Sequence, residues 1–201
     1  MNIGKRVRVA LAATVGVLVV ATALTAQPAS AADLPINLSG QVKSHIDAAV
    51  DSDVVFAATF NGGADVAAGT ISGDFAAEPS TLEFKALGLI PVKAGTKLNF
   101  TQPVSGTVDL ATLRVDVTAT FNIELTSFKA VGLPLLDPFR TCRTTTPISA
   151  NLTGTFDPVA GIVLTGTYTI PAFKDCGLAT PFITLFTSGP GNTIDATLAN
   201  V

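Results

Sequence analysis

The chain is poor in the residues that most catalytic and metal sites need. Its 201 residues include one histidine, two cysteines and no tryptophan, and 13% of them are charged. The single imidazole of His45 cannot build a zinc site of several histidines, and a Ser-His-Asp triad would also need a nucleophile motif that no serine shows. We therefore predict a protein that is not an enzyme and holds no metal ion or other cofactor.

Aromatic residues that anchor membrane barrels are equally scarce. Outer-membrane pores carry girdles of Trp and Tyr at both lipid boundaries, whereas this chain has no Trp and one Tyr, Tyr168. An outer-membrane pore is therefore the weakest function we consider, although its strands would show the alternation described below.

The first residues have the pattern of a secretory signal peptide. Three cations between residues 5 and 8 precede an apolar run, and Ala29-Ser30-Ala31 offers the small residues that signal peptidase needs. The alternative is a transmembrane anchor, but the run is short for a bilayer core of roughly 30 Å. We predict a leader over residues 1–31, no membrane span after cleavage, and a secreted protein that is extracellular or attached to the cell wall.

Removal of the leader would take away three cations and no acid. Nine Lys and Arg would then face fifteen Asp and Glu, and a net charge of −6 disfavours nucleic acid and anionic membranes as partners. About 170 residues suffice for one domain with its own core. We predict a single domain over residues 32–201.

An unbroken alternation of apolar and polar residues from Leu113 to Leu125 is the clearest structural signal. It is typical of a β-strand with one buried face, and Ile162 to Ile170 repeats it. The residues predicted to face the core are Val115, Val117, Phe121, Ile123, Leu164, Tyr168 and Ile170.

Further strands are predicted near both ends of the chain. Residues 33–50 alternate like a strand, although a helix also fits them. Val54 to Phe60 should form a hairpin with residues 70–75 through a turn at Asn61-Gly62-Gly63, and residues 193–198 should form a last strand. Thr180-Pro181 is predicted to open one helical turn over residues 182–186.

An internal duplication covers the middle of the chain, with copies at about residues 80–125 and 126–172. Phe84 to Leu89 recurs as Phe128 to Leu133, and the offset of 44 grows to 47 at the alternating strands. The three extra residues are predicted in a hairpin loop over residues 157–161, because loops tolerate insertions.

These elements predict an all-β antiparallel fold. We favour a two-sheet β-sandwich, with a closed β-barrel as the alternative. The two cysteines, Cys142 and Cys176, are expected to form a disulfide because the chain is predicted to be exported.

Other polar groups are assigned no function. Asp51 and Asp53 could pair as carboxylates, and Asp47 could join them around calcium, but neither a pocket nor an EF-hand spacing accompanies them. His45 is interpreted as a surface residue. The Thr-x-Thr series, such as Thr165, Thr167 and Thr169, could present hydroxyls to a glycan or to ice, yet Thr is also a common strand residue.

The C-terminal half resembles a known family. Leu164 to Pro171, Phe173, Cys176-Gly177 and Gly189 to Thr193 are similar to uncharacterised secreted proteins of actinobacterial type. The resemblance implies an exported, disulfide-containing, β-rich protein and offers no established activity or catalytic residues to transfer.

Two functions follow from these patterns. We favour a structural or binding module of the cell envelope or extracellular space, with a cell-wall component as a candidate partner. The alternative is a carrier that holds an apolar small molecule, such as a lipid, between its sheets. It rests on Ala119 and Gly166, small residues at matching inward positions, and on an apolar segment over residues 178–186 that could form a lid, although capping of the core explains that segment better.

We predict that the secreted form begins at Ala32 or Asp33, because cleavage follows Ala31 or Ala32. N-terminal sequencing of protein from the culture medium checks this expectation. Recovery of the chain from membranes with Met1 retained would contradict export.

Overall fold

β-Strands make up most of the residues that the computed structural model describes, which are 33–48, 50–136 and 140–201. The predicted signal peptide lies outside these residues. Among the described residues a single α-helix forms, α1 (Thr180–Thr187), directly after a 3-10 turn, η1 (Gly177–Ala179). No helix within these ranges is long and apolar enough to cross a membrane.

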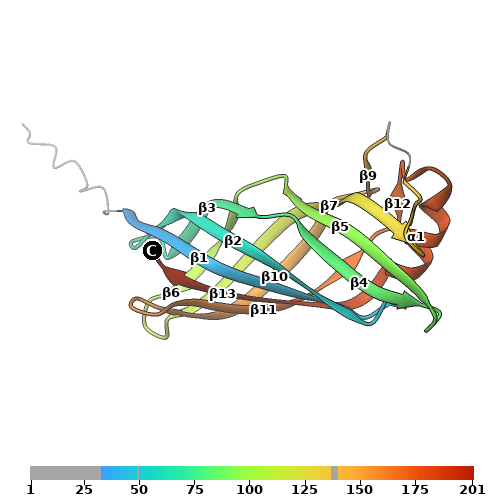
Figure 1. Ribbon diagram of the computed structural model, residues 1–201. Helices are drawn as coiled ribbons and strands as arrows, with labels where there is room; N and C mark the ends of the chain where they lie inside the picture. The colour runs from blue at the N-terminus through green and yellow to red at the C-terminus, as the bar shows by residue number, and fades with distance from the viewer. Residues whose placement is uncertain (1–32, 49, 137–139) are drawn as a thin grey trace, which may run out of the picture. The chain divides into compact units, whose positions relative to one another are not determined.

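Eight antiparallel strand positions follow one another around a closed barrel (Figure 1). Two of the eight positions each hold two consecutive strands: β3 and β4 share one position, and β5 and β6 share another. The strands are β1 (Asp33–Ile46), β2 (Ser52–Asp65), β3 (Thr70–Ala77), β4 (Ser80–Ala86), β5 (Ile90–Phe100), β6 (Val104–Asp109), β7 (Arg114–Ala130), β10 (Ile148–Asp157), β11 (Gly161–Ile170) and β13 (Gly189–Asn200).

The all-β antiparallel prediction is confirmed, and the barrel forms in place of the favoured sandwich. β13 pairs with β1, and β10 pairs with β7, so both possible sheet edges are closed by hydrogen bonds. A sandwich would leave such edges open, whereas a closed ring removes them.

β7 is the strand on which most of the pairing depends. One of its edges pairs with β5 and β6, and the other pairs with β8 (Leu133–Pro134), β9 (Cys142–Thr144) and β10. β12 (Phe173–Lys174) pairs with β9 beside it. The long alternating stretch of the sequence therefore lies at the centre of the pairing network.

The predicted core face is confirmed. All seven residues expected to point inward are buried, including Val115, Phe121 and Tyr168. Arg114 and Asp116 on the opposite face are exposed. Successive side chains of a strand leave opposite sides, so this one alternation sorts the polar residues to the outer surface of the barrel.

Three hairpin loops, residues 66–69, 110–113 and 158–160, define what we call the turn end of the barrel. Each follows an aspartate, Asp65, Asp109 or Asp157, whose carboxylate accepts hydrogen bonds from two backbone N–H groups of the loop. These bonds hold the pKa of Asp157 below its usual value, and a bond with the Thr112 side chain contributes most to the lowered pKa of Asp109.

The turn predicted at Asn61-Gly62-Gly63 is wrong, because β2 continues through it to Asp65. The predicted pairing of β2 with β3 is correct. Gly62 faces Gly73 on β3, and a Cβ at Gly62 would lie 2.6 Å from the Gly73 Cα. The glycines thus serve a close approach of two strands, and Asp65 starts the turn.

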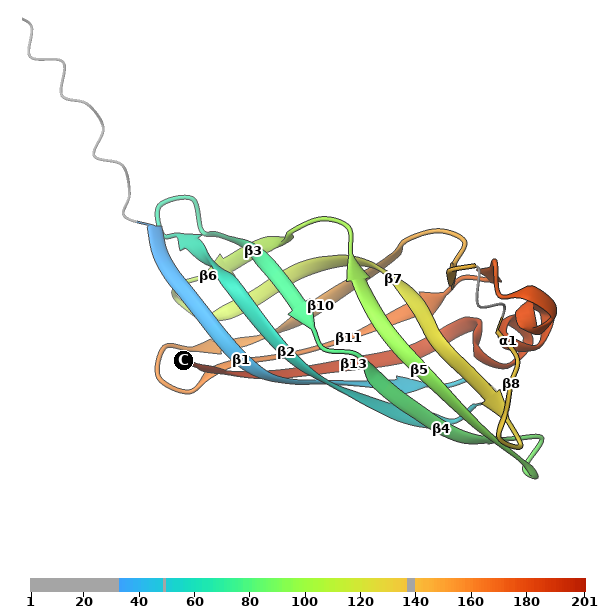
Figure 2. The same cartoon turned by 45° about the horizontal axis from the view of Figure 1, so that its top comes forward.

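The opposite end of the barrel, which we call the cap end, carries the turn between β1 and β2, two hairpin tips from the duplicated segments, and α1 (Figures 1 and 2). The tips are Leu87-Gly88 between β4 and β5 and Val131-Gly132 between β7 and β8, and all four residues have positive φ. These tips are the repeated Phe84–Leu89 and Phe128–Leu133 segments, so both copies build the same two-residue turn.

The length difference between the two copies lies in a strand and not in the predicted loop. The loop over residues 158–160 is shorter than the loop over residues 110–113, whereas β10 has ten residues against six in β6. The additional residues of β10 extend its pairing with β7 to eight positions, compared with five for β6.

A disulfide joins Cys142 of β9 to Cys176 before η1, as predicted, and both cysteines are buried. It ties the segment that follows β7 to the segment that carries α1. A buried disulfide is compatible with an extracellular location.

We predict that the Cys142→Ala/Cys176→Ala variant loses about 3–4 kcal/mol of unfolding free energy, the chain-entropy value for a loop of this size. Urea unfolding measures the loss. Reduction should destabilise the wild type by a similar amount and leave the variant unchanged. Two alkylatable thiols in the unreduced, denatured protein would contradict the bond.

Candidate functional site

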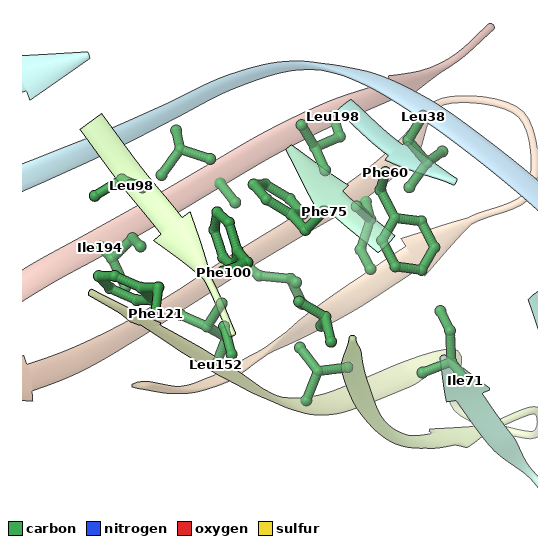
Figure 3. Close-up of a pocket in the computed structure, with 17 residues that line it drawn as sticks. Leu38, Phe60, Ile71, Phe75, Leu98, Phe100, Phe121, Leu152, Ile194 and Leu198 are labelled. Atoms are coloured by element: carbon green, nitrogen blue, oxygen red, sulfur yellow. The ribbon is translucent and has the colours of Figure 1, made fainter. Parts of the chain in front are cut away.

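An apolar cavity of about 50 Å³ lies inside the barrel (Figure 3). All eight strand positions contribute to its wall, and no polar atom faces it. The lining residues are Leu38, Val42, Phe60, Ile71, Phe75, Leu98, Phe100, Val104, Val117, Ala119, Phe121, Leu152, Ile162, Leu164, Ile194, Ala196 and Leu198. Such a wall can bind hydrocarbon and offers no hydrogen bond to a polar ligand.

A row of aromatic rings crosses the interior from the cavity wall. Ring centroids are separated by 4.9 Å between Phe75 and Phe100, 5.5 Å between Phe100 and Phe121, and 6.1 Å between Phe121 and Tyr168. The first three rings lie in succession along the cavity in Figure 3. These tilted and edge-on contacts are favourable for aromatic pairs, and each ring limits the space beside its neighbour.

The barrel wall is interrupted beside this row. β3 pairs with β6 up to Gly73, β4 pairs with β5 from Ser80, and no backbone pairing joins the described residues 74–79 to 97–103 between them. Pro79 and Pro103 lie in this gap and have no N–H to donate. Phe75 and Phe100 are the half-buried members of the lining, so their rings close the wall where the hydrogen-bond ladder is missing.

This gap was not among the features predicted from the sequence. Its signal was nevertheless present, because Glu78-Pro79 and Gln102-Pro103 each break a run of strand residues close to a Phe. Proline in the middle of a sheet removes a ladder hydrogen bond, and a proline in each of two neighbouring segments indicates a break in pairing.

The row ends at a buried polar pair. The hydroxyls of Tyr168 and Ser44 share a hydrogen bond, and both residues are buried. Burial raises the pKa of Tyr168 above its ordinary value of 10.0, and the bond with Ser44 acts in the opposite direction. These two hydroxyls form a buried polar contact outside the apolar cavity.

The two small residues that support the carrier hypothesis have different surroundings. Ala119 lines the cavity, as that hypothesis requires. Gly166 leaves no room for a ligand, because a Cβ there would lie 2.3 Å from the carbonyl oxygen of Asn151 on β10. Gly166 therefore permits close strand approach.

The apolar segment over residues 178–186 divides its side chains between two environments. Ile183 is fully buried and Phe186 packs against the core, so α1 caps the barrel as expected. Leu178, Phe182 and Leu185 are exposed. A helix forms where predicted, with Pro181 in its first turn, but it is longer than one turn and its N-cap residue is Ala179, so Thr180 is not the cap that its sequence indicated.

His45 lies on the outer surface with its acidic neighbours. Its Nδ1 is 3.0 Å from an oxygen of Asp53, its Nε2 is 3.7 Å from Asp51, and the Lys43 ammonium contacts Asp53 at 2.8 Å. The hydrogen bond from Lys43, followed by that from His45, holds the pKa of Asp53 below its usual value. This cluster is an exposed ion-pair network, which contributes little to stability.

Within the described residues, no group of three or more His, Cys, Asp or Glu side chains is placed to hold a metal ion. The Thr series lies on the outer face of neighbouring strands, where Thr118 donates a hydrogen bond to the Asn151 side chain. Thr153 and Thr165 face each other across β10 and β11. Such cross-strand contacts are ordinary in sheets.

Comparisons with protein-family models, with curated proteins and with solved structures find no match to this chain.

We predict that Tyr168→Phe lowers the unfolding free energy by about 1–2 kcal/mol, because the buried Ser44 hydroxyl loses its partner. A double-mutant cycle with Ser44→Ala should show coupling between the two side chains.

The raised pKa of Tyr168 also predicts a pH dependence. Above pH 10.0 the folded state retains the phenol proton of Tyr168 while the unfolded state loses it, so the free energy of unfolding should fall as the pH rises further.

The chain has one Tyr, so its ultraviolet tyrosinate absorbance reports on this residue alone. Ionisation of folded Tyr168 at its ordinary pKa, or additive effects of the two substitutions, would contradict the buried pair.

Proposed function

We propose that this is an exported, non-enzymatic protein that binds an apolar molecule inside its barrel. The observation that carries the proposal is the apolar cavity, which is lined by residues from every strand position of the ring. Proteins pack their interiors to nearly crystal density, so a cavity in the middle of a barrel is a candidate binding site.

The size of the cavity constrains how a ligand binds. An engineered cavity of about 150 Å³ accepts benzene, so 50 Å³ is too small for a lipid chain unless side chains move. Phe75 and Phe100 are placed to move, since each is half-buried and lies at the interrupted part of the wall. Outward rotation of these rings would widen the cavity and open a path from solvent.

Export is supported by two independent features. The first residues have the pattern of a cleavable leader, and the disulfide between Cys142 and Cys176 suits an oxidising compartment. Membership of the actinobacterial family of secreted proteins remains a prediction from the resemblance. The ligand class we propose is a slender hydrocarbon such as an acyl chain.

The envelope module favoured from the sequence is the second candidate. Large apolar side chains at the cap end support it, because exposed apolar patches commonly mark interaction surfaces. A pore finds less support, since the apolar residues of β7 point into the barrel and Arg114 and Asp116 point out, opposite to a lipid-embedded barrel.

We predict that Phe100→Ala strengthens binding of a neutral apolar fluorophore, N-phenyl-1-naphthylamine, by roughly fivefold or more, because it opens the wall and enlarges the cavity. Ala119→Leu should abolish binding by filling the centre. Phe84→Ala is the matched control, because Phe84 is buried but does not line the cavity. Fluorescence titration measures affinity, and thermal unfolding verifies that each variant is folded.

Native mass spectrometry and organic extraction of protein from the culture medium provide a second test. We expect a bound apolar molecule in wild type and less of it in Ala119→Leu. The proposal would be overturned if wild type and Phe100→Ala were both folded, carried no such molecule and did not bind the fluorophore.

A further inference from the structure

Six large apolar residues at the cap end are left in solvent. They are Leu87 and Leu89 on the first hairpin tip, Val131 and Leu133 on the second, and Leu178 and Leu185 around α1. We call them the apolar rim, and between 66% and 94% of each residue is exposed. Both views place their elements at the same end of the barrel (Figures 1 and 2).

Two rim residues occupy positions that disfavour their residue type. Leu87 has φ 54° and Val131 has φ 51°, in the left-handed region where hairpin turns prefer Asn, Asp or Gly. Both copies of the duplication nevertheless place an exposed apolar residue there. Leu113 at the turn end also has a positive φ, 56°, but it is half-buried, whereas the exposed Leu87 and Val131 gain no burial within the described barrel that would offset the strain.

Positive charge gathers around the rim although the mature chain is acidic. Residues 43–48, 50–53, 80–97, 122–136, 140–144 and 173–187, which include the strand ends and turns at the cap end, contain eight Lys and Arg against six Asp and Glu. The other described residues contain one Arg against eight Asp and Glu. In both copies a lysine, Lys85 or Lys129, lies two residues before the tip.

We propose that the cap end docks on a bilayer that contains anionic lipids, with the rim inserted among the head groups and acyl chains. Interfacial binding grows with the apolar area inserted and with attraction between basic side chains and anionic lipid. The apolar rim supplies the inserted area, and the lysines and arginines around it supply the attraction to anionic lipid. This proposal departs from the expectation based on net charge, because the field at the surface depends on where the charges lie.

The turn end shows why charge decides the orientation. Its loops also expose apolar side chains, including Leu110 and Val159, but each loop follows an aspartate. The β1–β2 turn places Asp47, Asp51 and Asp53 at the cap end, but Lys and Arg outnumber the acids there, so an anionic surface favours the cap end over the turn end. The proposal depends on surface residues alone and is therefore independent of the cavity.

Single-tryptophan reporters test the orientation, because the natural chain has no Trp. Leu89→Trp and Val159→Trp are matched, with native exposures of 84% and 88% at opposite ends. Added vesicles of phosphatidylcholine with phosphatidylglycerol should shift the emission of Leu89→Trp to shorter wavelength. They should leave Val159→Trp unchanged, and vesicles of phosphatidylcholine alone should give a weaker response.

Charge reversal on one strand tests the electrostatic contribution. Lys129 and Arg114 lie at opposite ends of β7 and are both exposed. Lys129→Glu should weaken vesicle binding by about thirtyfold, since each charge near the surface changes it by about fivefold. Arg114→Glu changes the net charge equally and should alter binding less than about twofold, as measured by co-sedimentation.

The apolar contribution is tested by Leu87→Asn/Val131→Asn, which suits the positive φ at both tips. Its vesicle binding should fall by about tenfold or more, and its melting temperature should stay the same or rise. Wild-type protein that does not bind anionic vesicles, or equal responses from both Trp reporters, would overturn the proposal. A shift in Leu89→Trp without vesicles that grows with protein concentration would also overturn it, in favour of a second copy as the partner.

Discussion

The pairing of β7 on both edges is the constraint on which the structure depends. This strand forms hydrogen bonds with five others, and each copy of the duplicated segment supplies its partners on one edge. Its alternation fixes which side chains point inward for all of them, because paired strands share one pleat. The apolar cavity and the polar outer surface follow from that single pattern.

The strands that pair with β7 are interrupted at prolines. β5 ends before Pro103, and β10 begins after Pro147. On one edge of β7, β12 and the disulfide support β9 before β10 begins. Beside the other edge, the rings of Phe75 and Phe100 lie where no backbone pairing joins the described residues 74–79 to 97–103. At that place the wall is held by side-chain contacts, and contacts between rings can open at lower cost than a ladder of backbone bonds.

Local patterns in the sequence predicted most strands and the direction of their side chains. Val115 and Tyr168 are buried as expected because period-2 alternation directly encodes which face is apolar. The choice between sandwich and barrel depended on whether β13 would reach β1, a contact between distant residues that no local pattern reports. Asn61-Gly62-Gly63 was misread because glycine serves tight turns and close strand approach alike. The cavity depends on how all strand positions pack together, so composition could not reveal it.

The register between β1 and β13 has a consequence for biogenesis. Leu38 lies opposite Asn200, and the last residue donates a backbone hydrogen bond to Asn37. β1 (Asp33–Ile46) is synthesised long before β13 (Gly189–Asn200), so one edge of β1 has no partner until the strands between them have been made. Its exposed edge could pair with other chains in that interval. Completion of the ring therefore requires β13, and β1 needs protection from other strand edges until β13 has been made.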